Sequence, residues 1–338
     1  MTGLKLTVKA NRLRRALFLY ASNRSLRAWA ALVSHLAGRA AGRQLLACLV
    51  VGTTFRCQCR CGHCYAQAFE EGAPEEMDTG QIVSLLEQAR RLGALEVIFS
   101  GGEPLLRRDI VALVARARGL GFLTRIDTNG WLLAPGLVSR LKEAGLTQFG
   151  ISIDDADPET HDRLRGLPGL FAALVRGTKI LREHGIPFQV ITYGERGKVT
   201  AGLERIIGLG KRLGAYAVFM IVPVASGRWA DRLEVALTPE ETDRMRSLQD
   251  LRLVYMNVPT PDARCPVLAR SILYVTPQGE VSPCPMIPYS IGNLRESTLA
   301  DVWRRHCAGF RLESRGGYCL MNSSGDRETL RKHAESLR

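Results

Sequence analysis

The side chains best suited to chemistry are cysteines gathered in one short stretch. Four of the nine cysteines in the chain lie between residues 57 and 64, and Cys57, Cys61 and Cys64 have the spacing C-x3-C-x2-C. Three thiolates on one loop can bind three corners of a cubane iron–sulfur cluster and leave the fourth iron free for an enzymatic ligand. Zinc is the alternative metal, because closely spaced cysteines beside a histidine, here His63, also suit it.

The cysteine spacing, followed at once by Tyr65, resembles that of the radical S-adenosylmethionine (radical SAM) family. In that family the free iron binds the amino and carboxylate groups of SAM, and reductive cleavage of SAM gives a 5′-deoxyadenosyl radical. The resemblance implies that Cys57, Cys61 and Cys64 hold a [4Fe–4S] cluster and that Tyr65 belongs to the SAM site. Cys59 stands where the family usually has a non-ligand, and we expect it to be a spare thiol.

A second motif, Ser-Gly-Gly-Glu-Pro at residues 100–104, resembles the GGEP sequence of the family. In the family the backbone and the glutamate of this motif hold the SAM amino group, which implies this role for Gly101, Gly102 and Glu103. Two glycines also let the backbone pass close to a ligand. Because the motif follows the cysteine loop by about forty residues, it favours the iron–sulfur interpretation over zinc.

Two later motifs also resemble SAM contacts. Thr128 begins a Thr-Asn-Gly sequence that in the family supplies a hydroxyl near the SAM carboxylate, although Asn-Gly is also typical of a simple turn. Ser152 and Asp154 resemble the S-x-D motif of the family, which implies a place for Ser152 near the SAM carboxylate and for Asp154 near the ribose. Asp157 either continues this family-like stretch or caps a helix.

Cysteines near the end of the chain indicate a second cluster. Cys265, Gly279 and Cys284 have the spacing C-x13-G-x4-C, which resembles the opening of a SPASM or twitch domain, a module with one or two auxiliary iron–sulfur clusters. A full SPASM domain continues with a dense cysteine array, whereas only Cys307 and Cys319 follow here. The resemblance therefore implies one auxiliary [4Fe–4S] cluster held by Cys265, Cys284 and Cys319, with Cys307 as a further candidate ligand. Buried structural cysteines are the alternative.

The elements that must position these motifs alternate between strand and helix from residue 44 onward. Predicted strands cover residues 46–51, 95–99, 123–127, 148–153, 188–191 and 216–222. Six such units in series predict an α/β fold with parallel strands and right-handed crossovers, in a barrel or a doubly wound sheet. The resemblance implies an incomplete parallel (β/α)6 barrel. Each motif follows a predicted strand, and active sites of such barrels lie at the C-terminal ends of strands.

The chain divides into three predicted regions. Residues 1–43 form a basic amphipathic helical segment, residues 44–228 the radical SAM-like partial barrel, and residues 229–338 a SPASM- or twitch-like region. In the last region, residues 272–276 and 280–282 flank a Pro-Gln-Gly turn, which predicts a β-hairpin.

The N-terminal part of the chain carries most of the net positive charge. Eleven Lys and Arg precede the first acidic residue, Glu70, and the net charge of the whole chain is +13. Apolar residues at helical spacing predict two helices after a short extended start, with a break at residues 23–25 and an end at Gly38. Such a segment can lie on an anionic membrane, but we expect it to pack across the bottom of the barrel with its arginines in water. No nucleic-acid motif accompanies the charge, so no nucleic-acid partner is expected.

Composition and the resemblance together limit the class of protein. No apolar run is long enough for a transmembrane helix, and the odd, clustered cysteines favour metal binding in a reducing cytoplasm, either free or peripheral at the membrane. The resemblance implies an enzyme that abstracts hydrogen from a peptide, a peptide-derived or a cofactor-precursor substrate, with an electron donor such as flavodoxin or ferredoxin. The alternatives are a membrane-associated enzyme acting on a lipid or isoprenoid, and an iron–sulfur electron carrier, which would leave Glu103 and Asp154 unexplained.

Overall fold

The computed structural model describes residues 2–66, 75–197, 199–250, 252–256, 265–310 and 319–337, with backbone alone for residues 2–9, 12 and 200. Within these residues the strands form one ten-stranded sheet in the order β10-β9-β8-β1-β2-β3-β4-β5-β6-β7. Its strands are β1 (Cys48–Thr54), β2 (Glu96–Gly101), β3 (Leu123–Thr128), β4 (Gln148–Ser152), β5 (Phe188–Tyr193), β6 (Ala217–Ile221), β7 (Val254–Met256), β8 (Ile272–Val275), β9 (Glu280–Ser282) and β10 (Gly292–Asn293).

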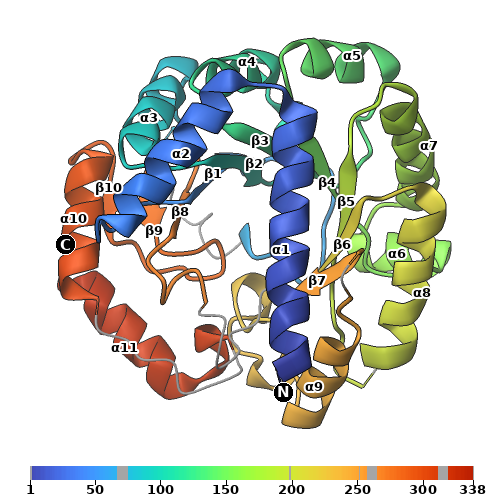
Figure 1. Ribbon diagram of the computed structural model, residues 1–338. Helices are drawn as coiled ribbons and strands as arrows, with labels where there is room; N and C mark the ends of the chain where they lie inside the picture. Colours follow the sequence, from blue (N-terminus) through green and yellow to red (C-terminus); the bar gives the residue numbers. More distant parts are fainter. Residues whose placement is uncertain are drawn as a thin grey trace.

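Strands β1 to β7 run parallel, each paired with the next. Helices connect them on the outside (Figure 1), namely α3 (Thr79–Arg91), α4 (Ile110–Gly119), α5 (Pro135–Glu143), α6 (Pro158–Arg165), α7 (Leu170–Glu183), α8 (Val199–Leu213) and α9 (Pro239–Ser247). The predicted partial β/α barrel is confirmed. A strand was predicted at residues 252–258 within the C-terminal region, and it is β7, which joins the barrel sheet as a seventh parallel strand.

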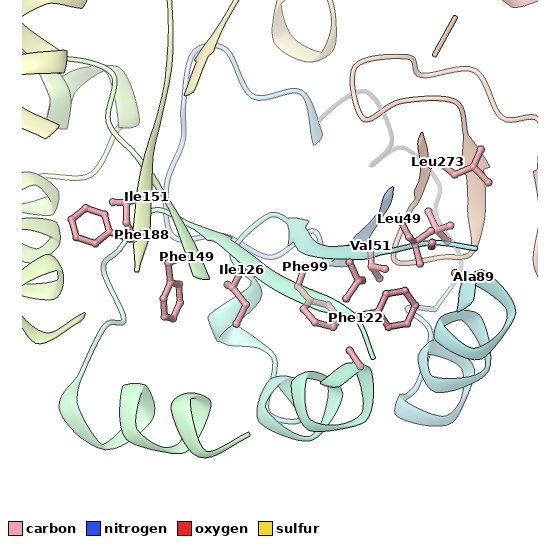
Figure 2. Packing of buried hydrophobic residues seen from close by; sticks show 14 of the residues in the cluster. Leu49, Val51, Ala89, Phe99, Phe122, Ile126, Phe149, Ile151, Phe188 and Leu273 are labelled. Atoms are coloured by element: carbon pink, nitrogen blue, oxygen red, sulfur yellow. The ribbon is translucent and has the colours of Figure 1, made fainter. Parts of the chain in front are cut away.

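The main core lies between the sheet and its outer helices. Phe99, Ile126 and Phe149, from three adjacent strands, are fully buried on the helix-facing side (Figure 2). Successive strand residues point to opposite faces of a sheet. Arg125 and Asp127, on either side of Ile126 in β3, therefore point to the inner face, where they form an ion pair. Burial of each large apolar side chain contributes roughly 2 kcal/mol. This burial holds the strands in place, and with them the C-terminal strand ends from which the loops with the motifs begin.

A hairpin ties the C-terminal region into the same sheet. Strands β8 and β9 pair antiparallel, as predicted, and Gly279 has a φ of +90° in their turn. Strand β8 also runs parallel to β1, with Leu273 opposite Leu49. The strand that leads into the cysteine loop is therefore flanked by β2 and β8. Helices α10 (Leu299–Gly309) and α11 (Ser324–Glu335) follow the hairpin.

The first two helices, α1 (Thr2–Asn23) and α2 (Leu26–Ala40), cross the N-terminal ends of the strands (Figure 1). Asn11 Nδ2 donates to the carbonyl oxygen of Asp250 at 2.5 Å, just before β7. Asn23 Nδ2 donates to Thr147 Oγ1 at 2.7 Å, just before β4. These contacts confirm that the segment packs across the bottom of the barrel.

Two expectations for this segment are wrong. Helix α1 already begins at Thr2, so there is no extended start. Helix α2 continues through Gly38, because Gly38 is buried and its missing side chain lets the helix lie against Leu45, where a Cβ would come within 2.9 Å of the leucine. Among the described residues, no helix is both long and apolar enough to cross a membrane.

Candidate active site

The cysteine loop leaves the C-terminal end of β1, and its first three cysteines lie side by side. The Cys59 N–H donates to Cys57 Sγ at 3.4 Å, and the side chain of Cys59 is hydrogen-bonded to those of Cys57 and Cys61. These hydrogen bonds lower the pKa of Cys57 and lower that of Cys61 to about 6, although burial opposes both shifts. The two outer thiols are therefore biased toward the thiolate, the form that binds metals.

The predicted cluster ligands share this loop but do not converge in the observed conformation. In the part of the chain that the structure describes, no three His, Cys, Asp or Glu side chains are arranged to hold a metal ion. Cys57 is exposed, Cys61 is buried and Cys64 is half-buried. The residues fit an iron–sulfur cluster by their chemistry, because three thiols sit on one loop and two of them have a lowered pKa.

Two side chains that the sequence analysis did not assign donate toward these sulfurs. Asn129 Nδ2 lies 3.9 Å from Cys57 Sγ, and Arg165 Nη1 lies 3.8 Å from Cys61 Sγ. Hydrogen bonds to cluster sulfurs are among the features that set the reduction potential of iron–sulfur centres. Asn129 belongs to the Thr-Asn-Gly motif, so its position was a usable signal, whereas nothing in the local sequence of Arg165 identifies its partner.

The turn after β2 fits against the backbone of the cysteine loop. Gly102 N donates to the carbonyl oxygen of Thr54 at 2.7 Å, and Glu103 N donates to that of Arg56 at 2.9 Å. A Cβ on Gly102 would lie 2.4 Å from the Arg56 oxygen, and one on Gly101, whose φ is +117°, would lie 2.5 Å from the Thr54 oxygen. Only glycine permits these approaches. The contact observed is with the loop itself, and contact with SAM stays a prediction.

Two further segments hold the same loop. Arg60 N donates to the carbonyl oxygen of Arg165 at 2.9 Å, at the end of α6. After β6, Arg228 N donates to the carbonyl oxygen of Cys64 at 3.1 Å, and its guanidinium donates to that of Arg60 at 3.2 Å. A Cβ on Gly227, whose φ is +59°, would lie 2.1 Å from the Cys64 oxygen. Three segments that follow strands therefore determine the path of the loop.

Glu103 is the buried acid of the site. Its side chain is fully buried, and its carboxylate accepts hydrogen bonds from Leu105 N at 3.0 Å, Thr128 Oγ1 at 2.8 Å and Asn129 N at 2.9 Å. Burial raises its pKa to about 7, and the three hydrogen bonds oppose the rise. Gly130 has a φ of +88°, so the Asn-Gly turn is also present. Thr128 and Glu103, both predicted near SAM, are bonded to each other.

Asp154, predicted near the SAM ribose, has charged partners within the protein. Its buried carboxylate accepts from Arg165 Nη2 at 2.8 Å and pairs with Arg165 Nε at 2.5 Å, while His63 Nε2 lies 3.5 Å away. Burial alone would raise the pKa of Asp154, but Arg165 and His63 hold it below its usual value. Because Arg165 also approaches Cys61, Asp154 places a guanidinium against the sulfur of a predicted cluster ligand.

The remaining predicted residues lie at the same strand ends. The hydroxyls of Tyr65 and Ser100 are 2.9 Å apart, which ties the aromatic residue of the cysteine motif to the end of β2. Ser152 is the last residue of β4. Asp157 Oδ1 accepts from Thr160 N at 2.9 Å, so Asp157 caps α6, as one of its two interpretations predicted.

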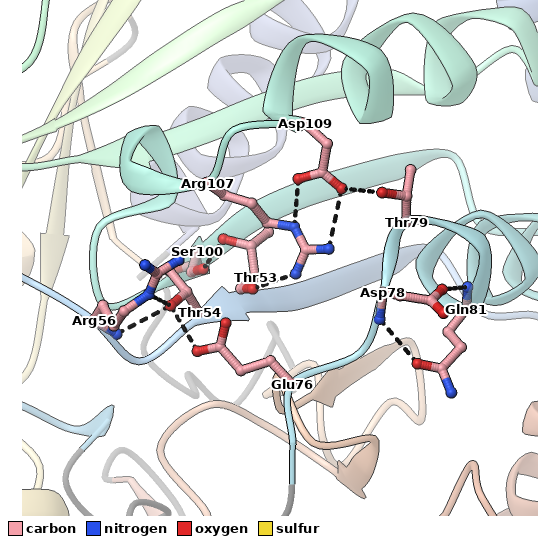
Figure 3. A network of polar contacts seen from close by, with 10 residues as sticks. All are labelled: Thr53, Thr54, Arg56, Glu76, Asp78, Thr79, Gln81, Ser100, Arg107 and Asp109. Atoms are coloured by element: carbon pink, nitrogen blue, oxygen red, sulfur yellow. Dashed lines mark hydrogen bonds and ion pairs between the residues drawn. The ribbon is translucent and has the colours of Figure 1, made fainter.

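A polar network fixes the point from which the loop departs (Figure 3). Arg107 Nη1 donates to the carbonyl oxygen of Thr53 at 2.9 Å, and Arg107 Nε donates to Asp109 Oδ1 at 2.7 Å. Glu76 Oε1 accepts from Thr54 Oγ1 at 2.7 Å. The end of β1 is thus bonded to the segment before α3 and to the segment before α4.

An aromatic cluster beside the loop was not predicted. The ring centroids of His63 and Tyr193 are 4.4 Å apart, and Trp229 packs against both at 5.7 and 5.4 Å. Tyr193 Oη and His63 Nδ1 are 2.9 Å apart. Tyr193 is the last residue of β5 and Trp229 follows β6, so their placement at strand ends was the available signal. Such rings can stack on a planar group.

Three of the four C-terminal cysteines influence one another. Burial raises the pKa of Cys284, and the nearby thiols of Cys265 and Cys319 raise it further. Burial likewise raises the pKa of Cys319 to about 12, with Cys265 adding to the shift. Cys307 lies apart on α10, where Arg270 Nη1 donates to its carbonyl oxygen at 2.7 Å. The grouping favours Cys265, Cys284 and Cys319 as the auxiliary ligands, and their ligation of a cluster stays a prediction.

Comparisons with known proteins show which families the chain matches. Two family models match the chain, the radical SAM superfamily over residues 51–207 and SPASM, an iron–sulfur cluster-binding domain, over residues 265–320. The PqqA peptide cyclase of Xanthomonas campestris pv. campestris is 32% identical over 270 residues, 74% of this chain and 71% of that protein. The AdoMet-dependent heme synthase of Oleidesulfovibrio alaskensis is 29% identical over 285 residues, 75% of this chain and 73% of that protein.

Solved structures share the fold. Streptococcus suis SuiB, bound to the precursor peptide SuiA, has a TM-score of 0.60 at 16% identity and covers 80% of this chain and 67% of its own. The enzyme anSMEcpe with bound AdoMet has a TM-score of 0.59 at 14% identity and covers 86% of this chain and 96% of its own. At these identities the likeness establishes the fold alone.

Proposed function

This chain belongs to the radical SAM superfamily and carries its SPASM iron–sulfur domain, and from that membership we propose that it abstracts hydrogen from a peptide or peptide-derived substrate. As a radical SAM enzyme it works with SAM, a SAM-binding [4Fe–4S] cluster and auxiliary iron–sulfur chemistry. A flavodoxin or ferredoxin is the proposed electron donor. The electron-carrier alternative is set aside, because the relatives are named enzymes.

The names of the relatives support a peptide substrate. The PqqA peptide cyclases are named for a peptide, and three of them are 32% identical to this chain. The AdoMet-dependent heme synthases match over a similar share of the chain, which makes a heme precursor the second candidate. A lipid or isoprenoid substrate is not proposed, because neither of these enzyme names refers to one.

The observation that carries the proposal is the backbone support of the cysteine loop by Gly102, Arg165 and Arg228. When bound, the cluster and SAM supply an electron and a 5′-deoxyadenosyl radical. In this proposal Cys57, Cys61 and Cys64 hold the cluster. The buried Glu103 carboxylate would accept hydrogen bonds from the SAM ammonium group, and the segments that follow the strands would hold Glu103 and the cysteine loop in place. Tyr65, Gly101, Thr128, Ser152 and Asp154 complete the proposed SAM site.

SAM cleavage tests the cluster assignment. Anaerobically reconstituted protein should form 5′-deoxyadenosine when dithionite supplies electrons. Changing Cys57, Cys61 and Cys64 together to Ala should abolish product, because the cluster loses its ligands. The matched control is Cys59→Ala on the same loop, which should retain cleavage. Activity lost in Cys59→Ala but kept in Cys57→Ala would show that the ligand register is wrong.

Isotope transfer tests the substrate class. A uniformly deuterated peptide that is a substrate should give deuterated 5′-deoxyadenosine, because hydrogen abstraction moves deuterium to the nucleoside. A deuterated heme precursor, assayed in parallel, should give none. Mass spectrometry of the nucleoside distinguishes the two, and deuterium arriving from the heme precursor alone would replace the peptide proposal with the second candidate.

A further inference from the structure

Helices α1 and α2 present large apolar side chains to solvent. Of the nine large hydrophobic residues that are exposed in the described part of the chain, seven lie on these two helices, namely Leu13, Leu17, Phe18, Leu26, Trp29, Val33 and Leu36. Leu26 is 86% exposed and Val33 is 64% exposed. The surfaces of monomeric soluble proteins rarely expose so many large apolar residues together, and such a patch marks an interaction site. We call these seven residues the apolar face.

Helix α2 is oriented with its small residues inward. Its buried residues are Ala28, Ala31, His35 and Gly38. Leu32 is half-buried against a small apolar cluster, whereas its other large apolar residues, Leu26, Trp29, Val33 and Leu36, are exposed. A helix that served only to cover the barrel would bury the large apolar side chains instead. Of the apolar face, Phe18 stacks on Tyr216 of the barrel, with ring centroids 5.1 Å apart. Helix α2 packs on the barrel without burying its four members of the face.

A basic cavity adjoins the apolar face. It has a volume of about 800 Å3, its wall includes Phe18, and its charged lining consists of Arg24, Arg118, Lys142, Arg182 and a single acid, Glu143. Among the described residues, no ion pair joins any of the four cations to a carboxylate. The cavity lies at the N-terminal ends of β4 and β5, since Thr147 and Phe188 also line it.

We propose that the apolar face and the basic cavity together dock this enzyme on an anionic phospholipid bilayer. The apolar side chains enter the boundary of the acyl chains, and the exposed Arg24, Lys142 and Arg182 face the phosphate headgroups, a combination typical of interfacial helices. Arg118 supports the cavity wall instead, because its guanidinium donates to Asn23. A second copy of the chain is disfavoured as the partner of this surface, because a symmetric dimer would bring the same four cations of both copies together, and like charges repel. The docked face lies at the end of the barrel opposite the cysteine loop, so docking leaves the active site open to the cytoplasmic side.

Vesicle binding by the full-length reconstituted protein tests the charge contribution. Vesicles of equimolar phosphatidylcholine and phosphatidylglycerol should sediment the protein, pure phosphatidylcholine should not, and binding should weaken from about 0.1 M to about 0.5 M NaCl. The triple variant Arg24→Gln, Lys142→Gln, Arg182→Gln should lower the partition coefficient about a hundredfold, at about fivefold for each charge removed. The charge-matched control is Arg108→Gln, Arg196→Gln, Arg232→Gln, three exposed residues that follow β2, β5 and β6 at the opposite end, and it should bind like the native protein.

A second pair of variants tests the apolar face. Leu26→Ser with Val33→Ser should reduce binding at every salt concentration, because both apolar side chains are exposed and available to the bilayer. Brominated phosphatidylglycerol should quench tryptophan emission in the native protein but not in Trp29→Phe, which should still bind. Absence of binding to the anionic vesicles, or binding that neither the triple variant nor the serine pair weakens, would overturn the proposal. The proposal would also be overturned if light scattering showed a dimer of the native protein, if the serine pair dissociated that dimer, and if the vesicles bound no protein.

Discussion

At the scale of single residues, Glu103 is a buried acid whose hydrogen bonds also hold the Thr-Asn-Gly turn after β3. Its carboxylate receives three hydrogen bonds, yet burial still raises its pKa to about 7 from 4.5. Between these two values the folded protein binds more protons than the unfolded chain does, so folding stability falls as the pH rises through this window. The ionised form is the one that a SAM ammonium would satisfy.

The first prediction concerns this pH dependence. In the protein without SAM, the free energy of unfolding should fall by up to about 3 kcal/mol between pH 4.5 and pH 8 through Glu103. Glu103→Gln removes the titrating group, so the variant should lack this part of the slope. Urea unfolding across that pH range gives both curves. Parallel curves for the native protein and the variant would mean that Glu103 has an ordinary pKa.

The role of Arg165, like that of Glu103, depends on partners from distant parts of the chain. It holds Asp154 by two nitrogens and approaches Cys61 Sγ at 3.8 Å. Its identity as an arginine is visible in the sequence, but its function depends on which acid and which sulfur lie nearby. The S-x-D resemblance directed attention to Asp154 and the ribose, while the structure pairs that acid with a cation of α6.

At the scale of elements, the cysteine loop has little regular structure of its own and takes its path from the ends of its neighbours. The turn after β2, the end of α6 and the segment after β6 each donate or accept backbone hydrogen bonds with the loop. Gly101, Gly102 and Gly227 are required where these backbones meet. The loop is therefore positioned by elements that are far from it in sequence.

The second prediction uses two glycines with nearly the same φ. Gly227 has a φ of +59° and a Cβ there would overlap the Cys64 oxygen, whereas Gly185 has a φ of +64° with open space around it. Gly185→Ala should cost about 1 kcal/mol through the backbone alone. Gly227→Ala should cost about 3 kcal/mol, because overlap is added to the same backbone cost.

Urea unfolding and iron content together measure this difference. The Gly227→Ala protein should also bind less iron after reconstitution, since displacement of Cys64 disturbs a predicted ligand. The Gly185→Ala protein should reconstitute fully. Equal losses of stability in the two variants, with equal iron contents, would contradict the inferred role of Gly227 in holding the loop.

At the scale of the whole molecule, two cofactor regions share one sheet. Strand β8 of the C-terminal region pairs with β1, which leads into the cysteine loop. Cys265, Cys284 and Cys319 come from three segments around this hairpin and influence each other's pKa. The hairpin therefore joins the predicted auxiliary cluster to the strand that supports the first one.

The third prediction separates the two clusters. The protein with Cys57, Cys61 and Cys64 changed to Ala should still bind about four irons, the content of one cubane. Adding Cys284→Ala should remove them, whereas adding Cys307→Ala should retain them, because Cys307 lies apart from the other three cysteines. Iron analysis after anaerobic reconstitution measures each variant. A triple variant that binds no iron would show that the C-terminal cysteines are structural.

Some features of this protein followed from the sequence because they depend on neighbours in the chain. The order of strands and helices, the hairpin around Gly279 and the cap at Asp157 arise from local preferences and were predicted. The cysteine spacing and the Gly-Gly-Glu-Pro turn identified the family, because each motif is contiguous and lies directly after a strand.

Other features were decided only by the tertiary structure, because they depend on contacts between distant segments. The pairing of β8 with β1, the bond between Thr128 and Glu103 and the approach of Arg165 to Cys61 join residues that no local pattern connects. The outward face of α2 belongs to the same group. Periodicity predicted that α2 is an amphipathic helix. Which of its faces is buried depends on the space between the helix and the barrel, which admits alanine and glycine but not leucine and tryptophan.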